Sequence, residues 1–235
     1  SGSGSATVSG STEDSDKSNA SDGRPAALPA QAALATLRQH IGQQHLRIQG
    51  NQLCKDAPIS VEFNSIAAGA VIDQIANRFE TLGINNYLIE VTGELRAQGA
   101  KPDGSPWRIA IEAPLDGSNR QAQKILTLNG QAVSTSGDYR QYREENGQRL
   151  SHLIDPRSLR PITHRLASVT VIQPKAMQAD GLSTLLMVLG PDAGYAWAVR
   201  NDIAALFVSR AESGFDTRST PAFDRMHGGK RPQQP

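Results

Sequence analysis

The sequence has few of the features that identify a partner directly. Its 235 residues include one cysteine, Cys54, and only 5% aromatic residues. A single cysteine excludes both an intramolecular disulfide and a thiolate metal cluster, so cysteine usage says nothing about the redox compartment. Twenty-four Lys and Arg against 23 Asp and Glu give a formal net charge of +1, without a long basic run. We therefore expect no nucleic-acid partner.

Long apolar runs and a signal peptide are also missing. No stretch approaches the roughly 20 apolar residues that span a bilayer, and the opening Ser-Gly-Ser-Gly lacks the basic-then-apolar pattern of a signal peptide. Residues 1–28 are mostly Ser, Gly, Asp, Asn and Ala, which bury too little apolar surface to offset the entropy of ordering. We expect a disordered tail or linker over 1–28 and a single domain over 29–235.

The rest of the chain has the pattern of an α+β protein. Apolar residues at intervals of three and four predict a helix over 66–82, capped by Asn64 or Ser65 and closed by Gly83. Alternating or β-branched residues predict strands, and shorter amphipathic patterns predict two further helices. The strands are expected at residues 87–97, 107–112, 124–128, 131–135, 168–172 and 203–208, and the helices at 182–189 and 192–200. We expect a mainly antiparallel sheet with helices packed on one side.

A cluster of oxygen-bearing side chains precedes and enters the helix predicted at 182–189. Asp180 occupies the expected N-cap position, and Ser183 and Thr184 follow one turn later, beside the positive end of the helix. A hard cation such as Mg²⁺ prefers oxygen ligands and commonly takes only one or two carboxylates. A capping motif that binds nothing fits the same residues, and the spacing alone favours it.

Two histidines are candidates for a general base. His152 lies in the stretch Ser-His-Leu-Ile-Asp-Pro-Arg (151–157), where Asp155 either orients the ring or begins a turn. His164 is a rival in the same part of the chain. For each of them, a surface histidine or a satisfied core histidine is the more common case.

Two further segments combine small residues with hydroxyl groups. Ser-Thr-Ser-Gly-Asp-Tyr (134–139) follows a predicted strand, and Glu-Phe-Asn-Ser-Ile-Ala-Ala-Gly (62–69) enters the helix over 66–82. Both permit close approach of backbone N–H groups to an anion, although a strand-to-turn junction and close helix–sheet packing explain them as well. The common phosphate-loop, dinucleotide, zinc-protease and nucleophile-elbow motifs are absent from the sequence.

Taken in order, these segments resemble the ApbE family of FAD:protein FMN transferases. The matching motifs are Ser-Thr-Ser-Gly-Asp-Tyr (134–139), Ser-His-Leu-Ile-Asp-Pro-Arg (151–157), Ser-Val-Thr-Val-Ile (168–172) and Ala-Asp-Gly-Leu-Ser-Thr (179–184). Val-Thr-Gly-Glu (91–94) and the stretch 103–112 also resemble the family, so the resemblance covers about residues 28–226. Four matches in order are far more specific than any one of them. The resemblance implies a T-fold-like α+β domain.

The resemblance also implies an activity and its site. Family members are Mg²⁺-dependent enzymes that split FAD, attach its FMN half through a phosphoester to a threonine of a target flavoprotein, and release AMP. His152 would then be the base that takes the threonine proton. The expected metal ligands are Ser65, Asp180, Ser183 and Thr184, and the expected FAD contacts are Glu62, Ala68 and Ile154.

Some parts of the sequence depart from the family pattern. Residues 66–73 lack the lysine and tyrosine that are common there, and a polar stretch follows Val8–Thr12, where a Met-Gly-Thr segment and flavin-contacting loops are expected. We therefore expect an internal deletion that removes part of the FAD pocket. The alternative function is a non-catalytic FAD-binding module or an inactive shortened derivative. The resemblance also implies a periplasmic bacterial lipoprotein anchored at the inner membrane, whose anchoring cysteine is not in this chain.

Overall fold

The computed structural model describes residues 31–114, 122–138, 142–145 and 148–227. The tail predicted over 1–28 lies outside these described residues. Contacts divide the chain into two compact units, Ser1–Ala57 and Pro58–Pro235. No helix within the described ranges is both long and apolar enough to cross a membrane.

The described part of the first unit is a helix followed by a hairpin. Helix α1 (Gln31–Arg38) is followed by the 3-10 turn η1 (Gln43–His45), and strands β1 (Leu46–Gln49) and β2 (Gln52–Lys55) pair antiparallel. The Nδ1 atom of His45 lies 3.0 Å from a carboxylate oxygen of Asp56. His45 thus has a local partner within this unit.

The second unit holds the elements that carry the predicted site. Its helices are α2 (Ala67–Thr81), α3 (Ala176–Leu189), α4 (Ala193–Arg200) and α5 (Pro221–His227). Its strands are β3 (Tyr87–Val91), β4 (Glu94–Gln98), β5 (Trp107–Glu112), β6 (Ala122–Leu128), β7 (Gln131–Gly137), β8 (Tyr142–Glu145), β9 (Gln148–Ser151), β10 (Ile154–Asp155), β11 (Arg160–Pro161), β12 (Leu166–Gln173), β13 (Ala204–Arg210) and β14 (Phe215–Ser219).

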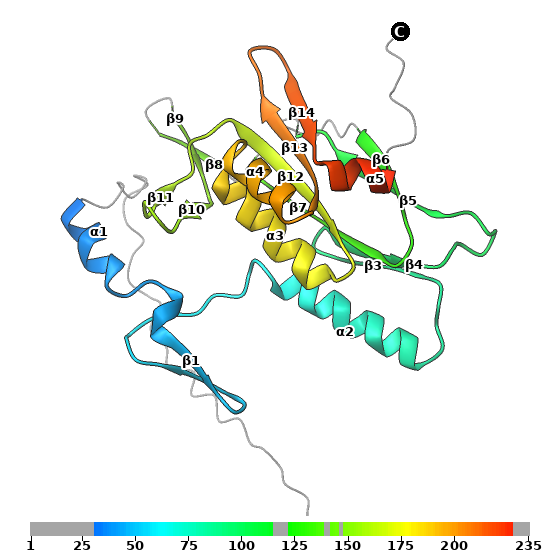
Figure 1. Ribbon diagram of the computed structural model, residues 1–235, viewed down its shortest axis with the longest axis horizontal. Helices are drawn as coiled ribbons and strands as arrows, with labels where there is room; N and C mark the ends of the chain where they lie inside the picture. Colours follow the sequence, from blue (N-terminus) through cyan, green and yellow to red (C-terminus); the bar gives the residue numbers. More distant parts are fainter. Residues whose placement is uncertain (1–30, 115–121, 139–141, 146–147, 228–235) are drawn as a thin grey trace, which may run out of the picture. The chain divides into compact units, whose positions relative to one another are not determined.

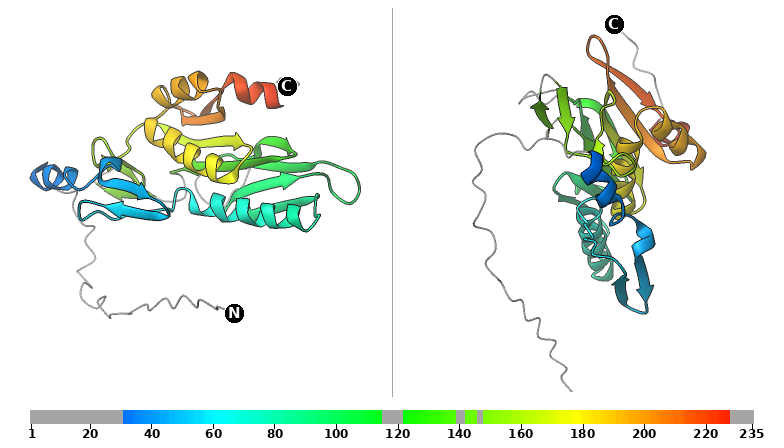
Figure 2. Two further views of the ribbon diagram at one scale, coloured as in Figure 1. Left: turned by 60° about the horizontal axis from the view of Figure 1, so that its bottom comes forward. Right: turned by 90° about the vertical axis from the view of Figure 1, so that its left-hand side faces the viewer.

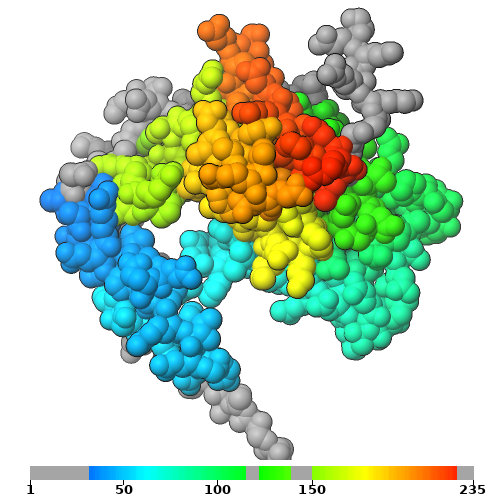
Figure 3. Space-filling model, in the orientation of Figure 1, coloured from blue at the N-terminus to red at the C-terminus, as the bar shows by residue number. Residues whose placement is uncertain are grey.

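A six-stranded antiparallel sheet forms the centre of this unit. Its strand order is β14-β13-β12-β7-β4-β3, and the smaller β5–β6, β8–β9 and β10–β11 pairs are antiparallel as well (Figure 1). The β13–β14 hairpin projects from the unit in the space-filling view (Figure 3). The α+β fold with a mainly antiparallel sheet is confirmed.

The two faces of the sheet are covered differently. Alternate residues of a strand point to opposite faces, so Val171 packs with α3 and α4 while its neighbour Ile172 packs with β5, β6 and α5. Helix α2 covers the β3–β4 end of the first face and packs beside α3 (Figure 2). Helices α2, α3 and α4 therefore share one face, while α5 and the β5–β6 hairpin cover the other, so the expectation that the helices pack on one side is wrong for α5.

One predicted strand is in fact a hairpin. Residues 87–97 were expected to form a single strand, but Thr92 and Gly93 have φ values of 54° and 105° and reverse the chain between β3 and β4. The left-handed region is costly for a residue with a side chain and cheap for glycine. The Thr-Gly pair therefore makes a tight turn that places Glu94 at the start of β4.

Candidate functional site

The candidate site lies where α2 and α3 approach each other most closely. A Cβ atom on Gly69 would lie 2.4 Å from the carbonyl oxygen of Ala176, closer than a real side chain can come. Glycine is thus required in the first turn of α2 because the backbone of α3 occupies the space of a side chain. Close packing thus explains Gly69, whereas its neighbours Ala67 and Ala68 are exposed and half-buried.

Both helices begin differently from the sequence prediction. Helix α3 begins at Ala176, so Asp180 lies in its second turn and is not its N-cap. The Ala-Met-Gln-Ala run before Asp180 consists of residues with good helix propensity, which extends the helix toward the N-terminus. Helix α2 has Ile66 at its N-cap, without a side-chain capping bond, and the side chain of Asn64 bonds Glu62 instead. Gly83 closes α2 with φ of 75°, as predicted.

Asp180 is a buried carboxylate with few groups around it that stabilise a negative charge. It is 5% exposed, and its Oδ2 accepts the backbone N–H of Gly69 at 3.1 Å. Burial raises the pKa of this carboxyl above its ordinary value, because an apolar environment disfavours the charged form. No basic side chain within the described ranges pairs with Asp180. A negative charge on Asp180 is therefore not balanced by a positively charged side chain of the described residues.

Glu94 adds a second carboxylate to the same neighbourhood. Its side chain accepts a hydrogen bond from the Thr92 hydroxyl at 2.9 Å. Burial raises the pKa of Glu94, and the charge of Asp180 raises it further. A cation close to both groups would relieve the repulsion that the Asp180 charge exerts on Glu94.

Four hydroxyl groups connect the face of β7 to α3. Ser183 is fully buried, and its Oγ lies 3.2 Å from Ser134 Oγ and 2.9 Å from Ser136 Oγ. Ser136 Oγ in turn lies 3.0 Å from Thr184 Oγ1. The hydroxyl of Ser183 also donates to the carbonyl oxygen of Asp180 at 2.9 Å.

The direction of these hydrogen bonds follows from proton counting. A hydroxyl donates one proton and accepts through two lone pairs. Since Ser183 gives its proton to Asp180, Ser136 must donate to Ser183, and Thr184 must donate to Ser136. Both lone pairs of Thr184 can then face a cation, whereas Ser183 accepts from Ser136 and Ser134 also bonds the carboxylate of Glu94.

Ser65 reaches the site through its backbone. Its side chain is exposed, but its carbonyl oxygen would lie 3.9 Å from a Cβ atom on Gly181. Asp180 and Thr184, four residues apart, share one face of α3. The structure thus places the Ser65 carbonyl beside Gly181, the residue that follows Asp180, and the metal-ligand role of Ser65, Asp180, Ser183 and Thr184 stays a prediction. Within the described ranges no group of three His, Cys, Asp or Glu side chains gathers, so the oxygen set is mixed.

The segment that carries His152 is more open. His152 is exposed, and Ile154 is 50% exposed. Between them, Leu153 packs on the apolar cluster that contains Leu186 of α3. The candidate base is therefore tied to the helix of Asp180 through its neighbour. Figure 3 shows residues 150–160, coloured yellow-green, at the surface of the second unit.

His164, the rival base, has a structural partner. Its Nε2 lies 2.9 Å from the carbonyl oxygen of Met187 near the end of α3, and its ring packs against Gly190. Burial lowers the pKa of His164, so the neutral ring is favoured. These contacts favour a core histidine for this residue, bonded through Nε2 while its buried Nδ1 has no hydrogen-bond partner among the described residues.

The three predicted FAD contacts fall in two places. Glu62 is exposed and Ala68 is half-buried, and both flank Ser65 at the start of α2. Ile154 lies on β10, which packs against α3. The role of these residues stays a prediction.

Sequence reasoning assigned no role to Glu94 or Asp73. Glu94 lies in the Val-Thr-Gly-Glu stretch, where the Thr-Gly turn signal was available, but strand pairing was needed to bring it to Asp180. Asp73 looked like an ordinary polar residue on the helix over 66–82. In the structure it contacts the start of α3, more than a hundred residues later.

Comparison with known proteins identifies the family. The model of the ApbE family matches residues 13–207. The chain belongs to the ApbE family. The match spans the helix, strand and hydroxyl segments that form the candidate site.

Relatives with known names and structures agree with this assignment. The chain is 42% identical over 203 residues to a FAD:protein FMN transferase of Vibrio cholerae and 41% identical over 208 residues to one of Haemophilus influenzae. It superposes on the apo crystal structure of the flavinyl transferase ApbE from Pseudomonas stutzeri with a TM-score of 0.80 and 54% identity, covering 87% of this chain and 63% of that one. A Vibrio cholerae ApbE flavin transferase gives a TM-score of 0.75 at 40% identity, covering 86% of this chain and 64% of that one.

The match covers only part of each relative. It includes 86% of this chain but 60% of the length of both the Vibrio cholerae and the Haemophilus influenzae proteins. The activity of the whole relatives is therefore a proposal for this chain.

Proposed function

We propose that the protein is a Mg²⁺-dependent flavin transferase that moves FMN from FAD to a threonine of a target flavoprotein and releases AMP. Membership of the ApbE family supports this proposal, as do relatives named FAD:protein FMN transferase. The observation that carries it is the buried Asp180 carboxylate, which lacks a basic partner among the described residues and lies beside Glu94 and the free lone pairs of Thr184.

The donor set at α3 fits a hard cation. Carboxylate, hydroxyl and carbonyl oxygens are ligands that Mg²⁺ accepts, and it commonly keeps waters and substrate phosphates in its remaining positions. Asp180, Thr184 and the carbonyl of Ser65 would hold the ion, and Ser183 would complete the set after releasing one of its serine neighbours. Bound Mg²⁺ would neutralise the pyrophosphate of FAD and the charge on departing AMP.

His152 would act on the acceptor. Its exposed ring would take the proton from the acceptor threonine, whose oxygen forms a new bond to the phosphorus of the FMN half. The bond from that phosphorus to the bridging oxygen breaks, and the oxygen leaves with AMP. An exposed base suits this step, because the acceptor is another protein that must reach the site from solvent.

FAD binding would involve both sides of α3. Glu62 and Ala68 lie in the segment of Ser65, and Ile154 lies two residues after His152. The half-exposed side chain of Ile154 offers apolar surface to the flavin end of the substrate. Contacts from these segments would hold the pyrophosphate between the metal ligands and the base.

The direct test is covalent labelling of an acceptor. The protein is incubated with FAD, Mg²⁺ and an acceptor flavoprotein domain, and flavin fluorescence on the acceptor is read in a denaturing gel. We expect a fluorescent acceptor band, and we expect none with an acceptor whose threonine is replaced by valine. No label at any enzyme concentration, with a full-length relative active in parallel, would contradict the transferase proposal.

A second candidate function is FAD binding without turnover. The partial coverage of the relatives favours it as an alternative. Calorimetric titration with FAD separates the two candidates, because FAD affinity with neither AMP release nor acceptor labelling identifies a binding module. If neither FAD nor Mg²⁺ raises the melting temperature, both candidates fail, since a ligand of the folded state must stabilise it.

The proposed location follows from the family resemblance alone. We propose a periplasmic site of action with lipid anchoring at the bacterial inner membrane. Fractionation of cells that express the natural gene tests this: recovery of the protein in the cytosol would contradict it.

A further inference from the structure

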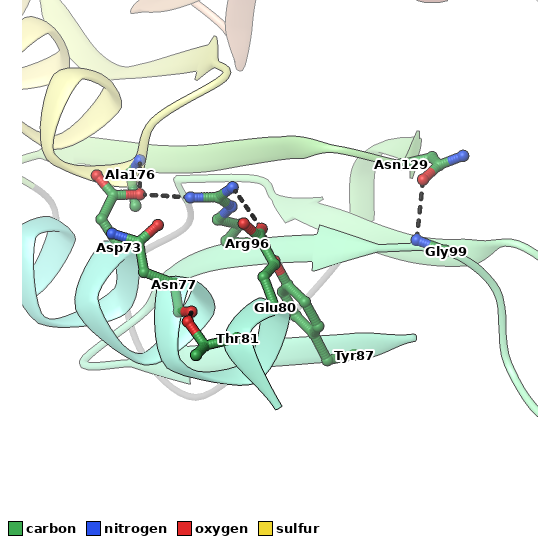
Figure 4. A network of polar contacts seen from close by, with 9 residues as sticks. All are labelled: Asp73, Asn77, Glu80, Thr81, Tyr87, Arg96, Gly99, Asn129 and Ala176. Carbon is green, nitrogen blue, oxygen red and sulfur yellow. Dashed lines mark hydrogen bonds and ion pairs between the residues drawn. The ribbon is translucent and has the colours of Figure 1, made fainter. Parts of the chain in front are cut away.

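Helix α3 begins without a cap of its own. Its N-cap residue is Lys175, which makes no side-chain capping bond. The first backbone N–H groups of a helix have no partner within the helix and need one from elsewhere. Asp73, in the second turn of α2, supplies it. Its Oδ1 accepts the N–H of Ala176 at 2.9 Å (Figure 4), and its Oδ2 accepts the N–H of Met177 at 3.1 Å.

Asp73 also has an ionic partner in the structure. Arg96 on β4 donates from Nη1 to Asp73 Oδ1 at 2.9 Å, and its Nη2 lies 3.3 Å from Glu80. Glu80 also accepts from the Tyr87 hydroxyl at 2.9 Å. The side chains of Asp73 and Arg96 are 16% and 14% exposed. Asp73 is thus held by the sheet on one side and by the start of α3 on the other.

The arrangement is reciprocal. Helix α2 also lacks a side-chain cap of its own, and the N–H of Gly69 in its first turn is accepted by Asp180 of α3. Asp73 of α2 caps α3, and Asp180 of α3 caps α2. A carboxylate near a helix N-terminus is favoured by the helix dipole as well as by the hydrogen bond. These two caps hold the first turn of α2 and the first turns of α3 in position relative to each other, close to Asp180.

We propose that Asp73 is a positioning residue for the Asp180 site. It holds the first turn of α3 against α2, so that Asp180 keeps one oxygen on Gly69 and presents the other to the cation. The inference rests on the metal site of the proposed function. Residues that orient metal ligands typically change metal affinity by 10–100-fold when mutated.

The chain offers a matched pair of variants. Asp73→Asn keeps the shape of the side chain but leaves one oxygen to serve two N–H donors and removes the charge. Glu80→Gln is the control, because Glu80 lies on the same helix and accepts from the same Arg96, and its bonds within the described ranges go to Arg96 and Tyr87 instead of to α3. Both variants weaken one ionic contact of Arg96, and only Asp73→Asn removes the cap of α3.

The first measurement is the affinity of the folded protein for Mn²⁺, a spectroscopic substitute for Mg²⁺, read by electron paramagnetic resonance. We expect Asp73→Asn to bind Mn²⁺ about tenfold more weakly or worse and Glu80→Gln to bind within about twofold of the wild type. Asp73→Glu keeps the charge but shifts the carboxylate by one methylene, so we expect an intermediate loss. If Asp73→Asn does not fold, Asp73→Glu takes its place in the test.

The second measurement needs no metal. The N–H of Gly69 lies in the first turn of α2, where no intrahelical acceptor exists, so its hydrogen exchange reports the bond to Asp180. We expect Asp73→Asn, but not Glu80→Gln, to speed exchange of this amide about tenfold relative to amides in the last two turns of α2.

The outcomes separate the two proposals. If the wild type does not bind Mn²⁺ but Asp73→Asn speeds exchange at Gly69, the metal site fails and the positioning role stands. If Asp73→Asn leaves Gly69 exchange at the wild-type rate, the positioning role is overturned whether or not Mn²⁺ affinity falls. Equal effects of Asp73→Asn and Glu80→Gln would also overturn it, because they would show general destabilisation.

Discussion

The surroundings of Asp180 and those of His152 contrast within one unit of the protein. Asp180 and Ser183 are almost fully buried and bonded to both β7 and α2. His152 lies exposed on the short connection between β9 and β10, and Ile154 lies exposed at the start of β10. One part is built into the core, and the other lies at its surface.

The contrast matches two different tasks in the proposed reaction. A cation site needs ligands that stay fixed, because binding is weakened when ligands must first be ordered. A base that serves an incoming protein needs access and tolerates a surface position. The predictions below test whether the two regions separate binding from proton transfer, and the largest expected effect comes first.

The largest effect is expected from Asp180→Asn. The amide oxygen still accepts the Gly69 N–H, so the fold keeps its contact, but the charge that attracts the cation is lost. We expect transfer to fall at least about a thousandfold, because a metal contributes several kcal/mol of transition-state stabilisation. Labelling and Mn²⁺ titration check this together. If Asp180→Asn binds Mn²⁺ as tightly as the wild type, the ion does not bind at Asp180. Asp180→Ala is the comparison variant that also loses the α2 cap.

His152→Asn is expected to affect proton transfer and to leave binding unchanged. Transfer should fall about a hundredfold or more, as for loss of a general base, while FAD and Mn²⁺ affinities stay near wild type. Because the residue is exposed, the free energy of unfolding should change by no more than about 0.5 kcal/mol. His164→Asn is the control, and it should instead lower stability with a smaller change in transfer. Parallel loss of binding and transfer in His152→Asn would mean that the residue is structural.

Gly69→Ala tests the close approach of the two helices. The added methyl group meets the backbone of α3, which cannot move without shifting the whole helix. We expect a loss of about 2–3 kcal/mol in the free energy of unfolding. Gly181→Ala meets the Ile66 side chain at 3.1 Å, which can rotate away, so its cost should be smaller. Chemical denaturation measures both, and equal costs would contradict the tight crossing.

The smallest effect is a pH dependence of stability without metal. The pKa of Asp180 is raised by burial in the folded state, so the folded protein holds a proton that the unfolded chain releases. Stability should therefore fall as pH rises from about 4, the ordinary carboxyl pKa, until it passes the raised folded pKa. The difference in unfolding free energy between wild type and Asp180→Asn isolates this contribution. Mg²⁺ should reduce the fall, and a wild-type curve parallel to that of the variant would show that Asp180 is not destabilised by burial.

Much of the fold was predictable from local sequence patterns. Helix α2 was predicted within one residue at each end, because Ile72, Ile75 and Phe79 recur with helical spacing and Gly83 ends the helix. Helix α3 was predicted six residues too late, since its start depends on a carboxylate from α2 that local spacing does not show. Strands β3 and β4 were merged because their apolar alternation continues through the turn at Thr92 and Gly93.

The sequence by itself determined the family, the helical and strand periodicities, and the ordered motifs that contain His152 and Asp180. These are properties of neighbouring residues, and side-chain spacing along the chain is enough to read them. Only the tertiary structure decided which polar groups meet: Glu94 with Asp180, Ser136 with Thr184, and Asp73 with the start of α3. Those contacts join residues that are distant in the chain, and they arise because burying the apolar faces of the sheet and helices leaves each backbone N–H and each hydroxyl in need of a partner.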